Sequence, residues 1–168
     1  MSSTPSPAIP EVDIDRASTV AAPDDAVFVA WATAALAALR MSGANVAVRL
    51  VDEGEARQLN RDYRGKDYAP NVLSFPLDDD FPLPPGEPRP LGDIVLCLSV
   101  VQAEAAEYGK SFEQRLAHLL IHGLLHLAGH SHDEEPQRLA METLETAIMA
   151  DLGLPDPYLS DFGALAPQ

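Results

Sequence analysis

Cysteine, membrane-spanning runs and targeting segments are scarce or absent in this 168-residue sequence. The single cysteine, Cys97, cannot form an internal disulfide, and its apolar neighbours predict a buried thiol, not a reactive or metal-binding one. The first seven residues have neither a basic nor an apolar segment, so we expect no signal peptide. The apolar stretch Ala26–Leu39 is too short to cross a bilayer. Together these features predict a cytoplasmic protein with no membrane contact.

Positive charge is scarce as well. Lys and Arg number 11 against 26 Asp and Glu, which gives a formal net charge of −15. Proteins that bind nucleic acids without specificity usually carry a basic surface, so this balance argues against broad nucleic-acid binding. Total charge does not exclude a local basic cleft, however, and several basic side chains are concentrated between Arg49 and Lys66.

The remaining composition is typical of one globular domain. Hydrophobic residues make up 46% and charged residues 22% of the chain, and its length suits one hydrophobic core. We expect residues 1–10, which are rich in Ser and Pro, to be a disordered extension, and residues 11–168 to form a single domain.

Hydrophobic periodicity predicts an α+β fold. Apolar residues in alternating or continuous runs indicate short strands at residues 12–14, 45–52, 70–76 and 92–98. A first helix is expected to begin at Asp24-Asp25 and to end at Gly43. Further helical stripes span residues 53–63, 100–108, 112–128 and 134–152. The proline-rich segment 76–90 is expected to be a surface loop. The pattern predicts a small mixed sheet covered by helices, with the helix at 112–128 in the interior.

Histidines at helical spacing are the strongest chemical signal in the chain. His122 and His126 are four residues apart, so they share one helix face and are close enough to hold one ion. Gly129 allows the chain to turn back after the helix and to bring a third histidine toward that ion. Three imidazoles with one open position are typical of a catalytic zinc site. Burying these imidazoles without a common partner would leave polar nitrogens unsatisfied, so we predict zinc binding and not a set of core histidines.

The third ligand has three candidates. His118 precedes the pair on the same helix, but each four-residue step adds about 6 Å along the axis, so we expect His118 to be a core residue or a partner of the ligands. His130 and His132 both follow the glycine, and we favour His132 because it has more freedom to fold back. The peptidase motif His-Glu-x-x-His has its general base where this chain has Gly123, so peptidase activity is not expected. The same metal could activate water to hydrolyse another bond, such as a phosphodiester.

These residues resemble a motif of the YbeY family of bacterial endoribonucleases and ribosomal-RNA maturation factors. The family motif reads His-Gly-x-Leu-His-Leu-x-Gly, then Tyr or His, then Asp-His. The chain matches it from His122 to His132 except at Ser131, where the family has aspartate and where we expect Asp133 to replace it in part. Residues 59–76 resemble the family's Leu-Asn-x-x-Tyr-Arg-x-Lys-Asp block and the Asn-Val-Leu-Ser-Phe-Pro that follows it. The Gly92-Asp-Ile strand and the segment from Gly153 to Tyr158 are also similar to the family pattern.

The resemblance implies a four-stranded mixed sheet packed with helices and a zincin-like helix that carries the site. It implies zinc held by His122, His126 and His132, and a functional Arg64, whose guanidinium can grip a phosphate bidentately. Lys66 is expected to help bind the substrate. The implied activity is zinc-dependent endonucleolytic cleavage of single-stranded RNA, in small-subunit ribosomal RNA maturation and ribosome quality control. The implied partners are ribosomal RNA and ribosomal proteins or ribosome-associated factors.

A ribosome-assembly factor that binds RNA or a ribosomal protein without cutting is the alternative. The net acidity and Ser131 favour it, whereas an open three-histidine site opposes it. An acidic protein that handles RNA must concentrate its basic residues, so four of them are expected on or near one wall of the metal cleft: Arg57, Arg61, Arg64 and Lys66. The acidic Asp78–Asp80 and Glu134-Glu135 are expected to face elsewhere.

Overall fold

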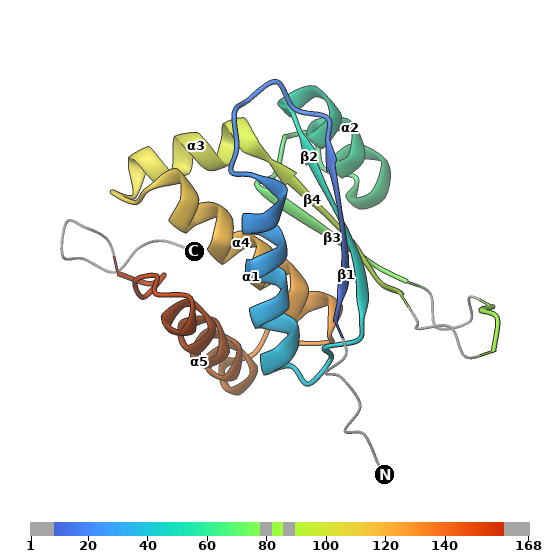
Figure 1. The fold of residues 1–168 in the computed structure, drawn as a ribbon. Coiled ribbons are helices and arrows are strands. Elements are labelled where there is room, and N and C mark those ends of the chain that lie inside the picture. Colours follow the sequence, from blue (N-terminus) through green and yellow to red (C-terminus); the bar gives the residue numbers. More distant parts are fainter. Residues whose placement is uncertain (1–8, 78–81, 86–89, 160–168) are drawn as a thin grey trace, which may run out of the picture.

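The computed structural model describes residues 9–77, 82–85 and 90–159 (Figure 1). Its four strands form one mixed sheet in the order β1-β2-β4-β3. β1 (Glu11–Arg16), β2 (Asn45–Val51) and β4 (Pro90–Cys97) run parallel, and β3 (Val72–Pro76) pairs antiparallel with β4. This confirms the predicted α+β fold. Most of the expected disordered extension, together with Asp78–Asp80, lies outside the described residues.

Helices cover both faces of the sheet, which explains why β4 is apolar and buried from Ile94 to Cys97. Ile94 and Leu96 face a core shared with α1 (Asp25–Ala38), α4 (Phe112–Leu127) and α5 (Glu135–Asp151). Val95 and Cys97 face a smaller core under α2 (Glu53–Arg64), on the opposite side of the sheet (Figure 1). α3 (Leu98–Glu107) follows β4 directly. A strand buried on both faces reads as a continuous apolar run, as β4 does between Ile94 and Cys97. No helix among the described residues is long and apolar enough to cross a membrane.

The histidine helix α4 runs through the main core. Its start is fixed by a capping box, in which Ser111 Oγ accepts from Gln114 N at 3.0 Å and Gln114 Oε1 accepts from Ser111 N at 3.2 Å. Most of its residues are buried, as predicted for the interior helix. Four elements therefore meet it closely enough to fix the direction of its side chains: α1, α3 (Leu98–Glu107), α5 and the sheet.

Two glycines allow α4 and the sheet to approach each other closely. A Cβ at Gly123 would lie 3.1 Å from Ser74 Oγ and 3.2 Å from Ile94 Cδ1. A Cβ at Gly92, which has φ 145°, would overlap a backbone oxygen of β3 and lie 2.9 Å from Leu127 Cδ2. The position that holds the catalytic glutamate in His-Glu-x-x-His thus faces the sheet here, where a long side chain has no room.

The end of α1 differs from the sequence prediction. The helix ends at Ala38, before Gly43, and Arg40 takes the left-handed conformation with φ 58°. Met41 N then donates to Leu36 O at 2.8 Å, which closes the helix in the manner usual for a glycine. The early turn puts partly buried Met41 against the core, and tertiary packing has therefore overridden the local glycine signal.

Candidate active site

Three histidines converge at the C-terminal end of α4. His122 Nε2 and His126 Nε2 are 3.0 Å apart, and the His132 ring centroid lies 5.4 Å from that of His122 and 5.0 Å from that of His126. One ring nitrogen of each histidine lies within 4.8 Å of the other two. His122 and His126 are half-buried and His132 is exposed, so the group has one side open to solvent.

A tight turn after α4 brings His132 to this group. Gly129 has φ 97°, and His130 N donates to Leu125 O at 2.9 Å, which reverses the chain after the helix. His132 then lies beside the helical pair, whereas His130 belongs to no group of close ligand atoms in the described part of the chain. The structure thus places together the three histidines that the sequence favours; that they bind a metal stays a prediction.

The donor set fits a zinc ion. Two nitrogens that bind one tetrahedral zinc at about 2.0–2.1 Å are about 3.3 Å apart. The 3.0 Å between His122 Nε2 and His126 Nε2 is within a small side-chain rotation of that value. Because burial and the neighbouring His122 and His132 lower the pKa of His126, its imidazole is neutral near pH 7, as a metal ligand must be.

A buried carboxylate, Glu145 of α5, supports the histidines from behind. Its side chain is 1% exposed. Glu145 Oε2 lies 2.5 Å from His118 Nε2 and 3.1 Å from His122 Nδ1, and Tyr158 Oη donates to Glu145 Oε1 at 2.5 Å. Burial alone would raise the pKa of Glu145, but the hydrogen bonds from His118 and His122 outweigh it and hold the pKa at about 2. Burial raises the pKa of Tyr158, and the hydrogen bond to the ionised Glu145 raises it further, so the Tyr158 hydroxyl keeps its proton.

The ionised carboxylate fixes the tautomers of both histidines. Burial lowers the pKa of His118 despite Glu145, so His118 is neutral and donates through Nε2. Its Nδ1 has no partner among the described residues, as suits the nitrogen without a hydrogen. His122 likewise donates through Nδ1, which leaves the lone pair of Nε2 directed toward His126. A carboxylate on the far nitrogen of a histidine is the usual support of a metal ligand.

The histidines form one end of a cleft of about 740 Å³. β3 and the end of α2 form its other walls, and its polar lining is Arg64, Asn71, Ser74, the three histidines and Asp133. Asp133 is the one carboxylate among the described lining residues, and it accepts a hydrogen bond from Ser131 Oγ at 3.0 Å. The residue that departs from the family motif therefore holds a neighbouring carboxylate at the cleft; that Asp133 replaces the family's aspartate stays a prediction.

Arg64 is the cation of this cleft. It is the last residue of α2, and it makes no hydrogen bond or ion pair with any residue that the structure describes. A solvated helix-end ion pair, the alternative role for such an arginine, is therefore not observed in that part of the chain. An unpaired guanidinium is available to bind an anion.

The prediction of a basic wall is wrong for Arg57 and Arg61. Gly65 ends α2 in the left-handed conformation, and the chain then turns so that Asp67 lies beside both arginines. Asp67 Oδ1 lies 2.7 Å from Arg57 Nε and 2.6 Å from Arg61 Nη2, and these hydrogen bonds lower the pKa of Asp67. Neither arginine lines the histidine cleft, and the one carboxylate of Asp67 offsets half of their combined charge.

The other charged side chains whose location was predicted from the sequence do not line the cleft. Lys66 is exposed and does not line the cleft, so its substrate-binding role stays a prediction. Glu134 and Glu135 are exposed and do not line it either, as expected.

Sequence reasoning gave no role to Glu145 or Tyr158. Glu145 lies on the buried stripe of α5 with Met141, Ile148 and Met149, and a carboxylate in an apolar stripe is a signal that could have identified it. Tyr158 was part of a matched segment, but only the fold shows that this segment returns to the histidines.

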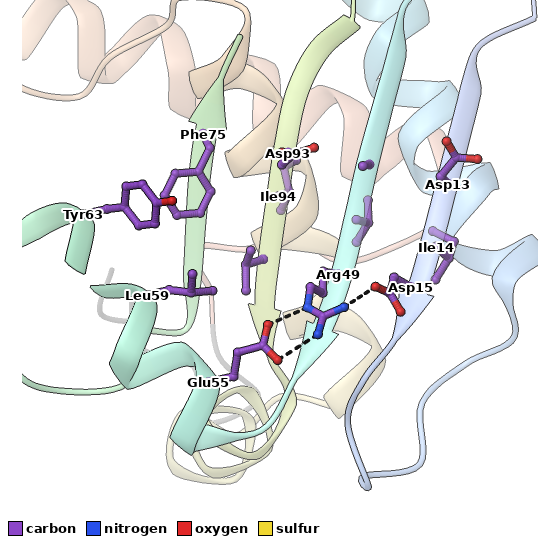
Figure 2. Close-up of a pocket in the computed structure, with 13 residues that line it drawn as sticks. Asp13, Ile14, Asp15, Arg49, Glu55, Leu59, Tyr63, Phe75, Asp93 and Ile94 are labelled. Atoms are coloured by element: carbon purple, nitrogen blue, oxygen red, sulfur yellow. Dashed lines mark hydrogen bonds and ion pairs between the residues drawn. The ribbon is translucent and has the colours of Figure 1, made fainter. Parts of the chain in front are cut away.

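A second groove of about 560 Å³ lies on the α2 side of the sheet (Figure 2). It contains four acidic residues, Asp13, Asp15, Glu55 and Asp93, and its cation Arg49 is bound on both sides. Arg49 donates to Glu55 Oε2 at 2.5 Å and Oε1 at 2.9 Å, and to Asp15. The groove is therefore acidic overall, unlike the histidine cleft.

Comparison with known proteins gives a consistent result. A sequence model of the family described as Endoribonuclease YbeY matches residues 15–153. A protein of that name from Pseudomonas putida is 49% identical over 156 residues, which cover 90% of this chain and 94% of that protein. Another, from Xanthomonas oryzae pv. oryzae, is 52% identical over 140 residues and covers 83% of this chain and 86% of its own. A solution structure from Thermotoga maritima is similar in fold, with a TM-score of 0.56 at 24% identity over 83% of this chain and 91% of that one.

Proposed function

Because the chain belongs to the YbeY family of endoribonucleases, we propose that it cleaves single-stranded RNA in the cleft that holds His122, His126 and His132. The observation that supports this most directly is the combination, in one cleft, of three converging imidazoles with an arginine that has no partner among the described residues. Imidazoles suit a divalent metal, and a guanidinium suits a phosphate, so the two halves of the site fit a metal-dependent phosphodiesterase.

Zinc is the proposed metal, since three neutral imidazoles with an open side are typical of catalytic zinc. When bound, it would supply a Lewis acid that lowers the pKa of water toward neutrality and polarises a phosphoryl oxygen. Glu145 would keep the Nε2 lone pair of His122 directed at the ion, because it holds the hydrogen on Nδ1.

Arg64 would bind the phosphate that is cut. Its five N–H donors can hold two phosphate oxygens at once and can stabilise the negative charge that develops on them. Lys66, two residues farther along, would contribute a charge to the flanking phosphates. A single strand can bend one phosphodiester into a cleft of this kind, whereas a duplex is recognised mainly by its outer shape.

We further propose ribosomal RNA, in small-subunit maturation and ribosome quality control, as the substrate in the cell. This part of the proposal is supported by the family resemblance, as are a cytoplasmic location and contacts with ribosomal proteins or ribosome-associated factors. The residues proposed to act as one domain are 11–168.

A non-cutting ribosome-assembly factor remains the second candidate. It is favoured by the formal net charge of −15 and by the position of Arg57 and Arg61, which pair with Asp67 outside the cleft and leave Arg64 as the one basic side chain among the described lining residues. In that case the metal would stabilise the fold or a binding surface and would not activate water.

The test is a cleavage assay on matched single-stranded and double-stranded RNAs with nuclease-free protein. Cleavage of the single strand should be lost with a chelator, return with zinc, and be lost in His126→Ala. Arg64→Ala should cut poorly with an unchanged melting temperature, whereas the control Arg57→Ala, on the same helix but outside the cleft, should retain activity. Zinc-loaded protein that binds the RNA and does not cut it would support the assembly-factor alternative.

A further inference from the structure

An exposed aromatic ring stands beside Arg64 in the histidine cleft. Tyr63 is 69% exposed, although large apolar side chains are usually covered. It lines the cleft that contains the histidines. Its hydroxyl makes no hydrogen bond with any part of the chain that the structure describes. The ring thus contributes little to the stability of the fold, and its position in the cleft suits contact with a ligand.

The ring is held in place before any ligand arrives. Phe75 of β3 packs against it edge to face, with ring centroids 5.1 Å apart and an interplanar angle of 63°. Phe75 is itself partly buried on the small core beneath α2, which anchors the pair to the sheet. A tyrosine has few rotatable bonds, and this contact restricts them further, so a ligand that stacks on Tyr63 would lose little additional side-chain entropy.

Charge defines which side of the ring a nucleic acid can occupy. Tyr63 and Phe75 line both the histidine cleft and the acidic groove on the α2 side of the sheet, and therefore separate the two. Figure 2 shows the aromatic pair at one end of the groove and Arg49 bound between Glu55 and Asp15. The groove would repel phosphates, whereas the cleft offers Arg64 and the histidine nitrogens. A strand held at Arg64 is thereby confined to the histidine side of Tyr63.

We propose that Tyr63 is a nucleobase-binding site: its exposed ring stacks on one unpaired base of the RNA strand whose phosphate is bound by Arg64. Stacking on aromatic side chains is the common way in which proteins hold unpaired bases, because every base has a π-face. A base inside a duplex is already stacked on both faces, so the site selects single strands. This inference rests on the proposed RNA substrate and identifies the residue that distinguishes a single strand from a duplex.

The test measures whether the Tyr63 ring and one particular base of the RNA contribute to binding through the same contact. A single-stranded oligonucleotide is made with an abasic ribose at each position in turn, and its binding to the full zinc-loaded chain and its cleavage are both measured. Tyr63→Leu should weaken binding and raise KM by roughly 5- to 150-fold, the range for loss of one stacked base. Tyr63→Phe and Tyr63→Trp, which keep a ring, should bind nearly as well as the original chain. Tyr68→Leu is the matched control, because Tyr68 is 50% exposed and does not line the histidine cleft.

At one nucleotide position the abasic substitution and Tyr63→Leu should not be additive, because each removes the same stacking contact. Additive losses at every position, or full binding by Tyr63→Leu, would overturn the proposal even if the chain cuts RNA. Non-additive losses of affinity without any cleavage would support the base-binding site and refute the proposed nuclease activity. Absence of RNA binding by the original chain would refute both.

Discussion

Replacing Glu145 with glutamine removes one charge from behind the histidines with almost no change in shape. The amide oxygen can take the place of Oε2 and accept from His118 and His122, while the amide N–H donates to Tyr158, whose hydroxyl reverses. Hydrogen bonds to charged groups contribute about 1.5–3 kcal/mol and neutral ones about 0.5–1.5 kcal/mol. Three such bonds at a side chain 1% exposed therefore predict a loss of roughly 3 kcal/mol in the free energy of unfolding.

Metal affinity is the more informative quantity for the same variant. Loss of a carboxylate behind a metal-binding histidine typically costs about 10- to 100-fold in affinity, or about 1.4–2.7 kcal/mol. Zinc affinity is measured by competition with a chromophoric chelator, unfolding by denaturant titration, and the His122 tautomer in metal-free protein by ¹⁵N NMR. Glu145→Gln should weaken zinc binding and reduce the Nδ1–H population of His122.

Glu104→Gln is the matched control for this variant. Glu104 is also largely covered, with 21% side-chain exposure, but its charged partner is Arg115 at 2.9 Å and not a histidine. This control should lose stability and keep its zinc affinity. If Glu145→Gln loses stability while its zinc affinity and its His122 tautomer are unchanged, Glu145 is a structural residue and the argument for its positioning role is refuted.

Further predictions concern the ligands, the fold and pH. His132→Ala should lose bound zinc in elemental analysis and His130→Ala should retain it; the opposite result would reassign the third ligand. Gly92→Ala should lower the free energy of unfolding by about 3 kcal/mol or more, measured by denaturant titration, because it combines a left-handed φ with a backbone clash. Arg40→Gly should raise the free energy of unfolding by about 1 kcal/mol, since glycine adopts this conformation without strain. The folded pKa of Glu145, about 2 against an ordinary 4.5, means that the unfolded chain takes up the proton first on acidification. Unfolding free energy at this site should thus be fully retained above pH 4.5 and fall by up to about 3 kcal/mol toward pH 2, and less in Glu145→Gln.

The fold class and the histidine pair could be predicted because both depend on local sequence. The spacing of His122 and His126 specifies a shared helix face, and the left-handed turn at Gly129 follows from a single residue. The apolar run from Ile94 to Cys97 indicated a strand, which the structure covers on both sides. Each of these patterns acts over a few residues, so no knowledge of distant contacts was needed.

Contacts between distant or turning segments were decided by the tertiary structure alone. Packing of Met41 ended α1 before Gly43, and the turn at Gly65 placed Asp67 where it pairs with Arg57 and Arg61, two of the cations expected at the cleft. Glu145 reaches His122 only because α5 packs against α4, at a separation of 23 residues in the chain. Sequence spacing specifies which side chains share a face, but the environment of a charge depends on every segment packed around it. The sequence by itself therefore determined which residues could bind a metal, and the tertiary structure decided which charges support them.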